Sequence, residues 1–184
     1  MPRLTAIPAE QAPGKAKDLL AGVQKQLGVT PNLMRTLANS PAALDAYLGF
    51  GAALGQGVLE GKIREQIALT VAEANSCDYC LAAHTTIGKL VGLSADELAA
   101  SRSASSWDPK INAALKFARL VVAKRGLVAD SDVSQLRQAG HSEAEVVEII
   151  ANVALNIFTN YFNHIAGTEV DFPKVTPAAG KVAA

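Results

Sequence analysis

Helix start and stop signals recur along this sequence and constrain its fold more than any other feature. Three prolines directly follow a residue that caps helix N-termini well, in the pairs Thr30-Pro31, Ser40-Pro41 and Asp108-Pro109. Two further places have capping-box spacing: Ser94 with Glu97, and Ser142 with Glu145. Four glycines stand where helices would end: Gly28, Gly92, Gly126 and Gly140. These signals predict helices over residues 9–27, 31–38, 41–56, 60–74, 77–91, 95–102, 109–125, 131–139 and 143–163.

The apolar side chains follow helical spacing rather than strand spacing. Ile111, Leu115, Ala118 and Val122 form one stripe at intervals of three to four residues. No period-two run bounded by turns is present, so we expect essentially no sheet. The segment 143–163 is apolar around much of its girth, which is typical of a helix in the centre of a fold or in an interface between subunits. The sequence therefore predicts an all-α protein.

Length and composition favour one packed domain. The chain has 184 residues, of which 49% are hydrophobic and 18% are charged. We expect a single helical domain over 1–184, with a core of about 8–172 and a loose tail at 173–184 that is rich in Ala, Gly, Pro and Lys. The apolar excess and the last helix also predict burial against another copy of the chain, and hence a homo-oligomer.

Charge and hydropathy exclude some partners. Seventeen basic and 17 acidic residues give a formal net charge of zero without a basic block, so we expect no nucleic acid and no anionic membrane as partners. No stretch approaches the roughly 20 apolar residues of a membrane span, and the first residues lack a signal-peptide pattern. We therefore expect a cytoplasmic protein. In that reducing compartment the two cysteines, Cys77 and Cys80, point to a reactive or metal-binding pair rather than a structural staple.

The cysteine pair has a histidine on the same helix face. Cys77, Cys80 and His84 follow an i, i+3, i+7 pattern. Asn75-Ser76 reads as a stop and restart, with Ser76 as N-cap and Cys77 in the first helical turn, where unpaired N–H groups and the helix dipole favour a thiolate. Only Cys80 has His84 one turn away, so we expect the imidazole to serve Cys80 first.

A carboxylate completes the set. Glu65 lies on the preceding predicted helix among apolar residues, where it would be costly to bury without a partner. If the chain reverses near residues 75–76, Glu65 and His84 lie roughly 15 Å and 12 Å from the turn and end up nearly level. Glu73 competes as the carboxylate but lies almost at the turn. Two thiols that can close a disulfide, an imidazole to move a proton and a carboxylate to orient it predict thiol redox chemistry.

Other interpretations of the same residues stay open. A zinc site could use Cys77, Cys80, His84 and Glu65, although structural zinc usually has more sulfur ligands and a second ligand pair. Inert buried thiols are a further alternative. Three residues outside the motif favour structural roles: His164 as a helix cap or core histidine, His141 as a loop residue, and Trp107 as a packing anchor.

The spacing Glu-x11-Cys-x2-Cys-x3-His, formed by Glu65, Cys77, Cys80 and His84, resembles the signature of the alkylhydroperoxidase D-like family within the carboxymuconolactone decarboxylase superfamily. Further similarity to its peroxidase-related branch lies in Pro31-Asn32-Leu33-Met34-Arg35 through Ser40-Pro41, and in Phe162-Asn163-His164 through Asp171-Phe172-Pro173. The resemblance implies a compact all-α fold with the CxxC at the N-terminus of a core helix, assembly as a trimer or hexamer, and no bound cofactor or metal.

The resemblance also implies an activity. A hydroperoxide would be attacked by Cys80 and the product resolved by Cys77, with Glu65 and His84 as proton relay and an external thiol as reductant. The family often has a second histidine directly before the second cysteine, where this chain has Tyr79. A tyrosine is a poor proton shuttle near neutral pH, which bears on peroxidase efficiency. The alternatives are a general dithiol oxidoreductase with a non-peroxide substrate and a zinc-stabilised helical module. The superfamily's decarboxylase activity is not expected, because that branch lacks the cysteine pair.

Overall fold

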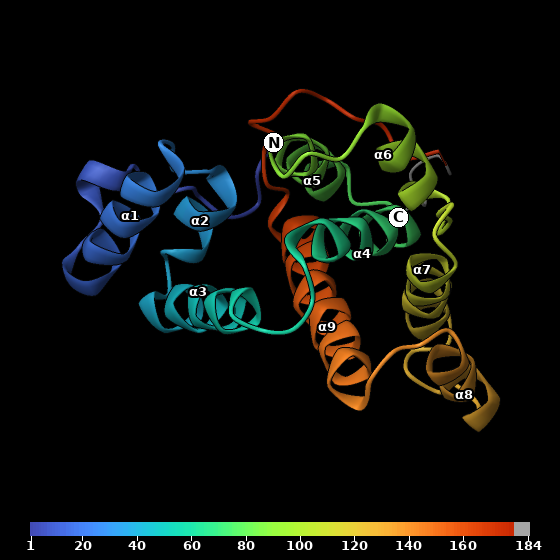
Figure 1. Cartoon of the computed structure of the whole chain (residues 1–184). Helices are drawn as coiled ribbons and strands as arrows, with labels where there is room; N and C mark the ends of the chain where they lie inside the picture. Colours follow the sequence, from blue (N-terminus) through green and yellow to red (C-terminus); the bar gives the residue numbers. More distant parts are fainter. Residues whose placement is uncertain (179–184) are drawn as a thin grey trace.

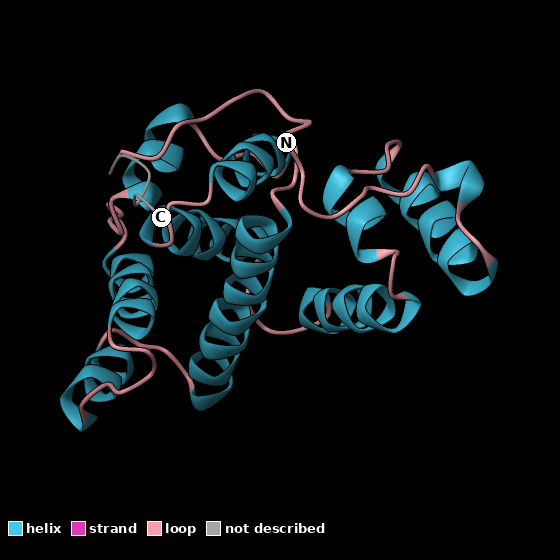
Figure 2. Cartoon of the chain, turned by 180° about the vertical axis from the view of Figure 1, so that it is seen from behind, coloured by secondary structure: helices cyan, strands magenta, loops and turns pink. Residues whose placement is uncertain are grey.

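The computed structural model describes residues 1–178, and within that range it consists of helices and loops without a strand (Figures 1 and 2). The prediction of an all-α fold is confirmed. No helix in this range has both the length and the apolar character needed to cross a membrane. A 3-10 turn at Ala9–Gln11 is followed by α1 (Gly14–Leu27), α2 (Asn32–Leu37), α3 (Pro41–Gly55), α4 (Gly61–Ala74), α5 (Asp78–Leu90), α6 (Ala95–Arg102), α7 (Pro109–Ala123), α8 (Asp130–Gln138) and α9 (Glu143–Ala166).

Most helix boundaries are set by the local signals of the sequence. Ser40 and Asp108 cap α3 and α7 by accepting backbone N–H groups of the first turn. Both capping boxes form, at Ser94 before α6 and at Ser142 before α9. Each cap satisfies N–H groups that have no partner within the helix. The four glycines predicted at helix ends all have positive φ angles: Gly28, Gly92, Gly126 and Gly140.

Two predicted starts near the N-terminus are wrong. The helix expected over 9–27 is divided because Pro13 has no N–H to donate and pushes Ala12 into an extended conformation, so α1 begins only at Gly14. Thr30 does not cap α2. The backbone N–H of Asn32 instead donates a hydrogen bond to Oδ2 of Asp171 at 2.6 Å. Asp171 comes from the far end of the chain. A tertiary partner thus replaces the local cap.

Helix α4 lies between two hydrophobic cores. Its residues 66–72 are all buried. Leu69 and Ala72 belong to a cluster with residues from α1, α2, α3 and α5, whereas Ile67 and Val71 belong to a cluster with residues from α7, α8 and α9. Figure 1 shows α1–α3 as an arm on one side of α9 and the α7–α8 pair on the other. The cysteine motif follows α4 directly, so it is held by the most buried helix of the fold.

Helix α9 is less buried than its sequence suggests. One face carries exposed apolar side chains, namely Val147, Ile150, Phe158, Tyr161 and Ile165. The opposite face carries, besides apolar residues, a run of buried polar ones: Asn152, Asn156, Thr159, Asn160 and Asn163. The helix is therefore amphipathic in an unusual sense, with a polar stripe turned inward and an apolar stripe turned outward.

The end of the described chain is tied to the core. Arg102 donates a hydrogen bond to the carbonyl of Thr176 at 2.7 Å, and the N–H of Ala178 donates one to the carboxylate of Glu73. Val175 packs against the cluster that contains the cysteines. Residues 173–178 of the expected tail make these contacts with the body of the fold. Residues 179–184 of the expected tail lie outside the described residues.

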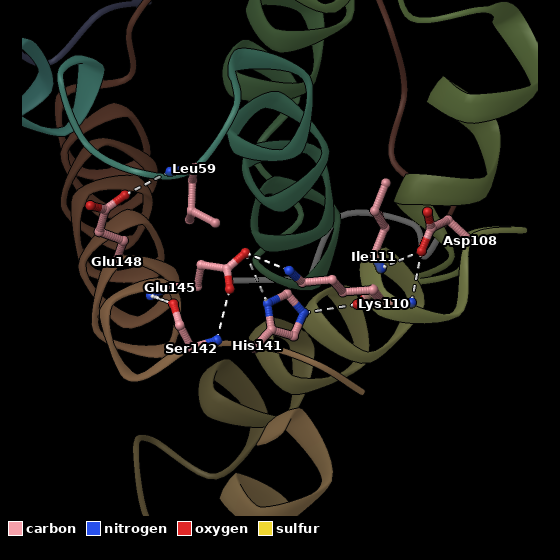
Figure 3. A network of polar contacts seen from close by, with 8 residues as sticks. All are labelled: Leu59, Asp108, Lys110, Ile111, His141, Ser142, Glu145 and Glu148. Carbon is pink, nitrogen blue, oxygen red and sulfur yellow. Dashed lines mark hydrogen bonds and ion pairs between the residues drawn. The ribbon is translucent and has the colours of Figure 1, made fainter. Parts of the chain in front are cut away.

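A polar network fixes the start of α9 against α7 (Figure 3). Glu145 accepts the N–H of Ser142 at 2.7 Å and pairs with the ammonium group of Lys110 at 2.8 Å. His141, expected as a plain loop residue, lies in the turn before α9 but is buried, and its Nε2 donates to the carbonyl of Lys110 at 2.9 Å. The hydrogen bond and charge of Lys110, helped by the Ser142 N–H, lower the pKa of Glu145 to about 2.

We expect Glu145 to make folding sensitive to acid. Because its pKa is lower in the folded than in the unfolded chain, its contribution is fully present above about pH 4.5 and is lost as the pH falls towards 2. Glu145→Gln should therefore weaken the acid dependence of the free energy of unfolding by about 2 kcal/mol between pH 6 and pH 3. Urea unfolding at both pH values measures it. Glu143→Gln, at the exposed partner of Arg137, is the control and should change little.

Candidate active site

The turn between α4 and α5 places the first cysteine. Ser76 has a φ of 53°, in the left-handed region, and turns the chain directly after α4. The N-cap of α5 is Cys77, not Ser76 as expected, and its sulfur accepts the N–H of Cys80 at 3.3 Å. Cys77 thus lies one position earlier than predicted. It still lies at the helix N-terminus, where unpaired N–H groups favour a thiolate.

The two cysteines are joined as a disulfide. Cys77 and Cys80 have their Cα atoms 5.3 Å apart, which suits a bond between their sulfurs. Both residues are almost fully buried, with 1% and 2% of their surface exposed. The expected disulfide-forming pair is therefore present, inside the protein rather than on its surface.

Glu65 and His84 meet as the helical hairpin predicts. Nδ1 of His84 donates to Oε2 of Glu65 at 2.7 Å, and both side chains are partly buried. This bond fixes the ring and leaves Nε2 as the nitrogen that can exchange protons with its surroundings. Glu73 does not compete for this role, because its carboxylate pairs with Arg102 at 2.7 Å at the other end of α4.

A cavity of about 200 Å³ lies beside the motif. Cys80 and His84 both line it, whereas Cys77 does not. Most of the remaining wall is apolar and comes from the α1–α3 arm, from α5 and from the C-terminal segment, including Leu27, Val29, Leu33, Met34, Tyr47, Ile87, Leu90 and Phe172. Among residues 1–178, the wall has no Asp, Glu, Lys or Arg side chain, and His84 is its only ionisable nitrogen group. The second cysteine thus borders an apolar pocket that also contains the imidazole.

A second cavity lies on the other side of the Glu65–His84 pair. It has a volume of about 250 Å³ and is lined by both members of the pair together with polar residues, including Arg64, Asn152 and Asn156. Tyr47 lines both cavities. Burial and the nearby charge of Glu65 raise the pKa of Tyr47 to about 12, so its hydroxyl stays protonated. Nothing in the sequence around Tyr47 connects it to the motif, because α3 is placed there only by tertiary packing.

Tyr79 is held by contacts with two distant segments of the chain. Its hydroxyl accepts the N–H of Leu33 at 3.0 Å, and its ring meets Phe172 edge-to-face at 5.8 Å. Burial is the largest cause of a strongly raised pKa, and a hydrogen bond and the charge of Asp171 raise it further. Tyr79 therefore stays neutral. It fastens the α2 segment and the C-terminal segment to the cysteine helix.

Asn163 is the site residue that sequence reasoning missed. Its Nδ2 donates to Sγ of Cys80 at 3.3 Å from the inner face of α9. In the sequence it stands out only as part of the similar Phe162-Asn163-His164 stretch, because 83 positions separate it from Cys80. No hydrogen bond joins His84 to either sulfur among the described residues. The side chain that touches the sulfur of Cys80 is thus an amide, and the imidazole of His84 lines the same pocket without a hydrogen bond to that sulfur.

The zinc hypothesis finds no ligand set in the described part of the chain. Across residues 1–178 no three His, Cys, Asp or Glu side chains are grouped in a way that could hold a metal ion. The arrangement instead joins a disulfide, a hydrogen-bonded His–Glu pair and an apolar cavity. Such a set can take up and release two electrons together with protons at one place.

Comparison with known proteins agrees with this geometry. Residues 41–123, which contain the whole motif, match the model of the carboxymuconolactone decarboxylase family. The match covers a little less than half of the chain. A shorter stretch of 45 residues is 49% identical to an uncharacterised protein of Haemophilus influenzae, and it spans 24% of this chain and 40% of that protein.

Solved structures extend the similarity to nearly the whole chain. A peroxidase-related protein of Ralstonia eutropha with an alkylhydroperoxidase AhpD core is 27% identical, has a TM-score of 0.82 and is covered over 92% of each chain. A peroxidase-related protein of Silicibacter is 21% identical, with a TM-score of 0.81 and 91% of each chain covered. The debrominase Bmp8 is also 21% identical, with a TM-score of 0.79 and 92% of each chain covered. The latter two show only a shared fold, which is the AhpD-like fold.

Proposed function

We propose that this protein is a thiol-dependent peroxidase that reduces organic hydroperoxides through a Cys77–Cys80 dithiol and disulfide cycle. One observation carries the proposal. A cysteine pair that forms a disulfide has its second sulfur beside a pocket that also holds the His84–Glu65 pair. Nucleophile, proton donor and resolving thiol are thus within one site.

The cycle follows from these positions. The Cys80 thiolate attacks the terminal oxygen of the hydroperoxide, the O–O bond breaks, and His84 supplies the proton that the departing alkoxide needs. Cys80 is then a sulfenic acid, and the two electrons taken from its sulfur are in the alcohol product. The Cys77 thiol attacks this sulfur, water leaves, and the disulfide forms. Glu65 accepts the Nδ1–H of His84 and stabilises the ring in its charged form.

The pocket supports an organic substrate. Its walls are mostly apolar, so a hydroperoxide with a hydrocarbon group gains from burial there and hydrogen peroxide does not. An external thiol has to return the disulfide to the dithiol. We place this cycle in the cytoplasm, where such thiols are abundant.

Consumption assays with dithiothreitol as reductant test the function. We expect kcat/KM for cumene hydroperoxide to exceed that for hydrogen peroxide by at least about tenfold, since a few buried methylene-sized groups contribute that much. Equal values would contradict the role of the apolar pocket. Absence of turnover with either peroxide, in a protein whose disulfide dithiothreitol does reduce, would contradict the peroxidase proposal itself.

A non-peroxide electrophile is the second candidate. The pocket that borders Cys80 has room for an aromatic ring, and Tyr79 is not available as a second proton shuttle beside the sulfur. The debrominase that shares this fold has been crystallised with 2,3,4-tribromopyrrole. If dithiothreitol drives bromide release from that compound but no peroxide consumption, the dithiol oxidoreductase alternative replaces the peroxidase.

We propose that the protein works as a trimer or hexamer. The outer face of α9 exposes five large apolar side chains, and most of α3 is apolar although Leu44 is its only fully buried residue among those described. A surface of this kind is typical of an interface between subunits. Light scattering should give a mass of three or six chains at micromolar concentration. A monomer would contradict this proposal but leave the proposed chemistry untouched.

A further inference from the structure

The two ends of the Asn163 side-chain amide differ: the nitrogen contacts the sulfur of Cys80, and the oxygen has no partner among the described residues. Nδ2 donates to Sγ of Cys80 at 3.3 Å. Oδ1 is buried and accepts no hydrogen bond from residues 1–178. The whole side chain is 5% exposed, and it lines the apolar pocket together with Cys80 and His84. A buried acceptor without a donor is unusual, and in an active site it points to a donor that is present at another stage of the reaction.

The oxidation state explains the missing donor. Cys80 is part of a disulfide, and a disulfide has no hydrogen to donate. A sulfenic acid on Cys80 would carry an O–H group, one bond away from the sulfur that Nδ2 already touches. Asn160, one turn earlier on α9, differs from Asn163 in which atom has no partner: its Oδ1 accepts a hydrogen bond from Asn75 at 2.9 Å, and its unpartnered atom is the donor Nδ2.

We propose that Asn163 is a catalytic residue of the peroxidase cycle, with Nδ2 stabilising the Cys80 thiolate and Oδ1 accepting the O–H of the Cys80 sulfenic acid. This inference rests on the proposed function. A hydrogen bond from an amide to a thiolate favours the charged form of the sulfur. It therefore prepares Cys80 for attack without a contact from His84, which is free to protonate the leaving oxygen.

In the proposed cycle the Asn163 amide makes a hydrogen bond to each successive state of Cys80. The thiolate attacks, a sulfur–oxygen bond forms as the O–O bond breaks, and the alkoxide takes its proton from His84. The new S–O–H group donates to Oδ1 and is held in one orientation. When the Cys77 thiol attacks, the sulfur–oxygen bond breaks, water leaves, and the disulfide again leaves Oδ1 without a donor, as observed.

The experiment uses the full chain with Cys77→Ser, so that Cys80 is the only thiol and its sulfenic acid is not resolved. Asn163→Ala removes both ends of the amide. Asn163→Asp keeps the shape and the acceptors but replaces the donor by a charge. The first measurement is the ultraviolet absorbance of the thiolate as a function of pH, together with the alkylation rate by iodoacetamide at pH 7. The second is the rate of sulfenic acid formation with cumene hydroperoxide, followed by dimedone trapping.

For both variants we expect the thiolate absorbance curve to move to higher pH. The alkylation rate and the rate of sulfenic acid formation should fall about tenfold in Asn163→Ala and further in Asn163→Asp, since a hydrogen bond to a charged group has at least that effect. Sulfenic acid should also be trapped by dimedone faster in Asn163→Ala, because its O–H is no longer held. Asn160→Ala is the matched control, since this buried amide on the same helix contacts Asn75 rather than Cys80 and is not among the residues that line the two cavities beside His84.

The outcomes separate the two proposals. If both Asn163 variants keep the absorbance curve and the rates of the parent, Asn163 is structural and the inference is wrong. If Asn163→Ala does not fold, the isosteric Asn163→Asp decides alone. If Asn160→Ala shows the same losses, the effect belongs to the packing of α9 and the inference is again wrong. If the parent consumes no hydroperoxide, the proposed function fails, yet the absorbance and alkylation measurements still decide whether Asn163 stabilises the thiolate.

Discussion

Cys80→Ser should abolish hydroperoxide reduction, whereas Cys77→Ser should consume one equivalent and then stop. The structure gives Cys80 the pocket and the Asn163 amide, and it gives Cys77 the helix N-terminus without a share of the pocket wall. A helix terminus stabilises an anion by about 0.3–1 kcal/mol, but it supplies no proton to a departing oxygen. His84 lines the pocket together with Cys80 and not with Cys77, so its imidazole can supply that proton when Cys80 is the attacking thiol. We therefore expect a trappable sulfenic acid on Cys80 in the Cys77→Ser protein.

Mass spectrometry with a sulfenic-acid probe on both single variants measures this. Serine is itself a good N-cap residue, so Cys77→Ser should leave the start of α5 unchanged and its effect belongs to the missing thiol. Circular dichroism of both variants serves as the control for folding. A sulfenate on Cys77 in the Cys80→Ser protein, with none on Cys80 in the other variant, would reverse the two roles.

Removing the imidazole should slow only those substrates that need a proton. General acid catalysis contributes typically 10²–10⁴-fold, so we expect His84→Gln to lower kcat/KM for tert-butyl hydroperoxide about 100-fold. Peracetic acid has a carboxylate as its leaving group, which departs without a proton, and its rate should fall much less. Glu65→Gln should have the same selective effect at smaller size, because the amide still accepts the Nδ1–H of His84 but does not stabilise the charged ring.

Glu73→Gln is the matched control on the same helix. This carboxylate is paired with Arg102 and with the Ala178 N–H, away from the pocket, and its loss should leave the rates of both substrates unchanged. Equal losses with tert-butyl hydroperoxide and peracetic acid in His84→Gln would show that the imidazole positions the thiol or the substrate rather than donating a proton.

The parts of the fold that could be predicted are those with local causes. Serine and aspartate caps, glycines with positive φ and the hairpin of α4 and α5 depend on neighbours within a few residues or on helix geometry alone. For the same reason the contact between Glu65 and His84 could be expected from their distances to the turn. Pro13 also acts locally, so the break between the 3-10 turn and α1 has a sequence signal of its own that the predicted range 9–27 does not reflect.

The remaining features depend on contacts between distant segments. The cap of α2 is supplied by Asp171, and the amide beside Cys80 by Asn163, neither of which has a local signal. Tyr47 reaches both cavities only because the α1–α3 arm packs beside α5 and α9. The cysteine helix start was misplaced by one residue, since Ser76 and Cys77 can both cap a helix and only the left-handed turn at Ser76 decides between them.

The depth of the disulfide has a kinetic consequence. Both cysteines are almost fully buried and only Cys80 borders the apolar pocket, so in the proposed cycle the thiol that recharges the pair would enter where the hydroperoxide enters and the alcohol leaves. Oxidant and reductant would then take turns in one space, which predicts parallel double-reciprocal plots and makes each of them, at high concentration, an inhibitor of the other's half of the cycle. A protein reductant would have to bring its thiol into this pocket on a segment narrow enough to enter it.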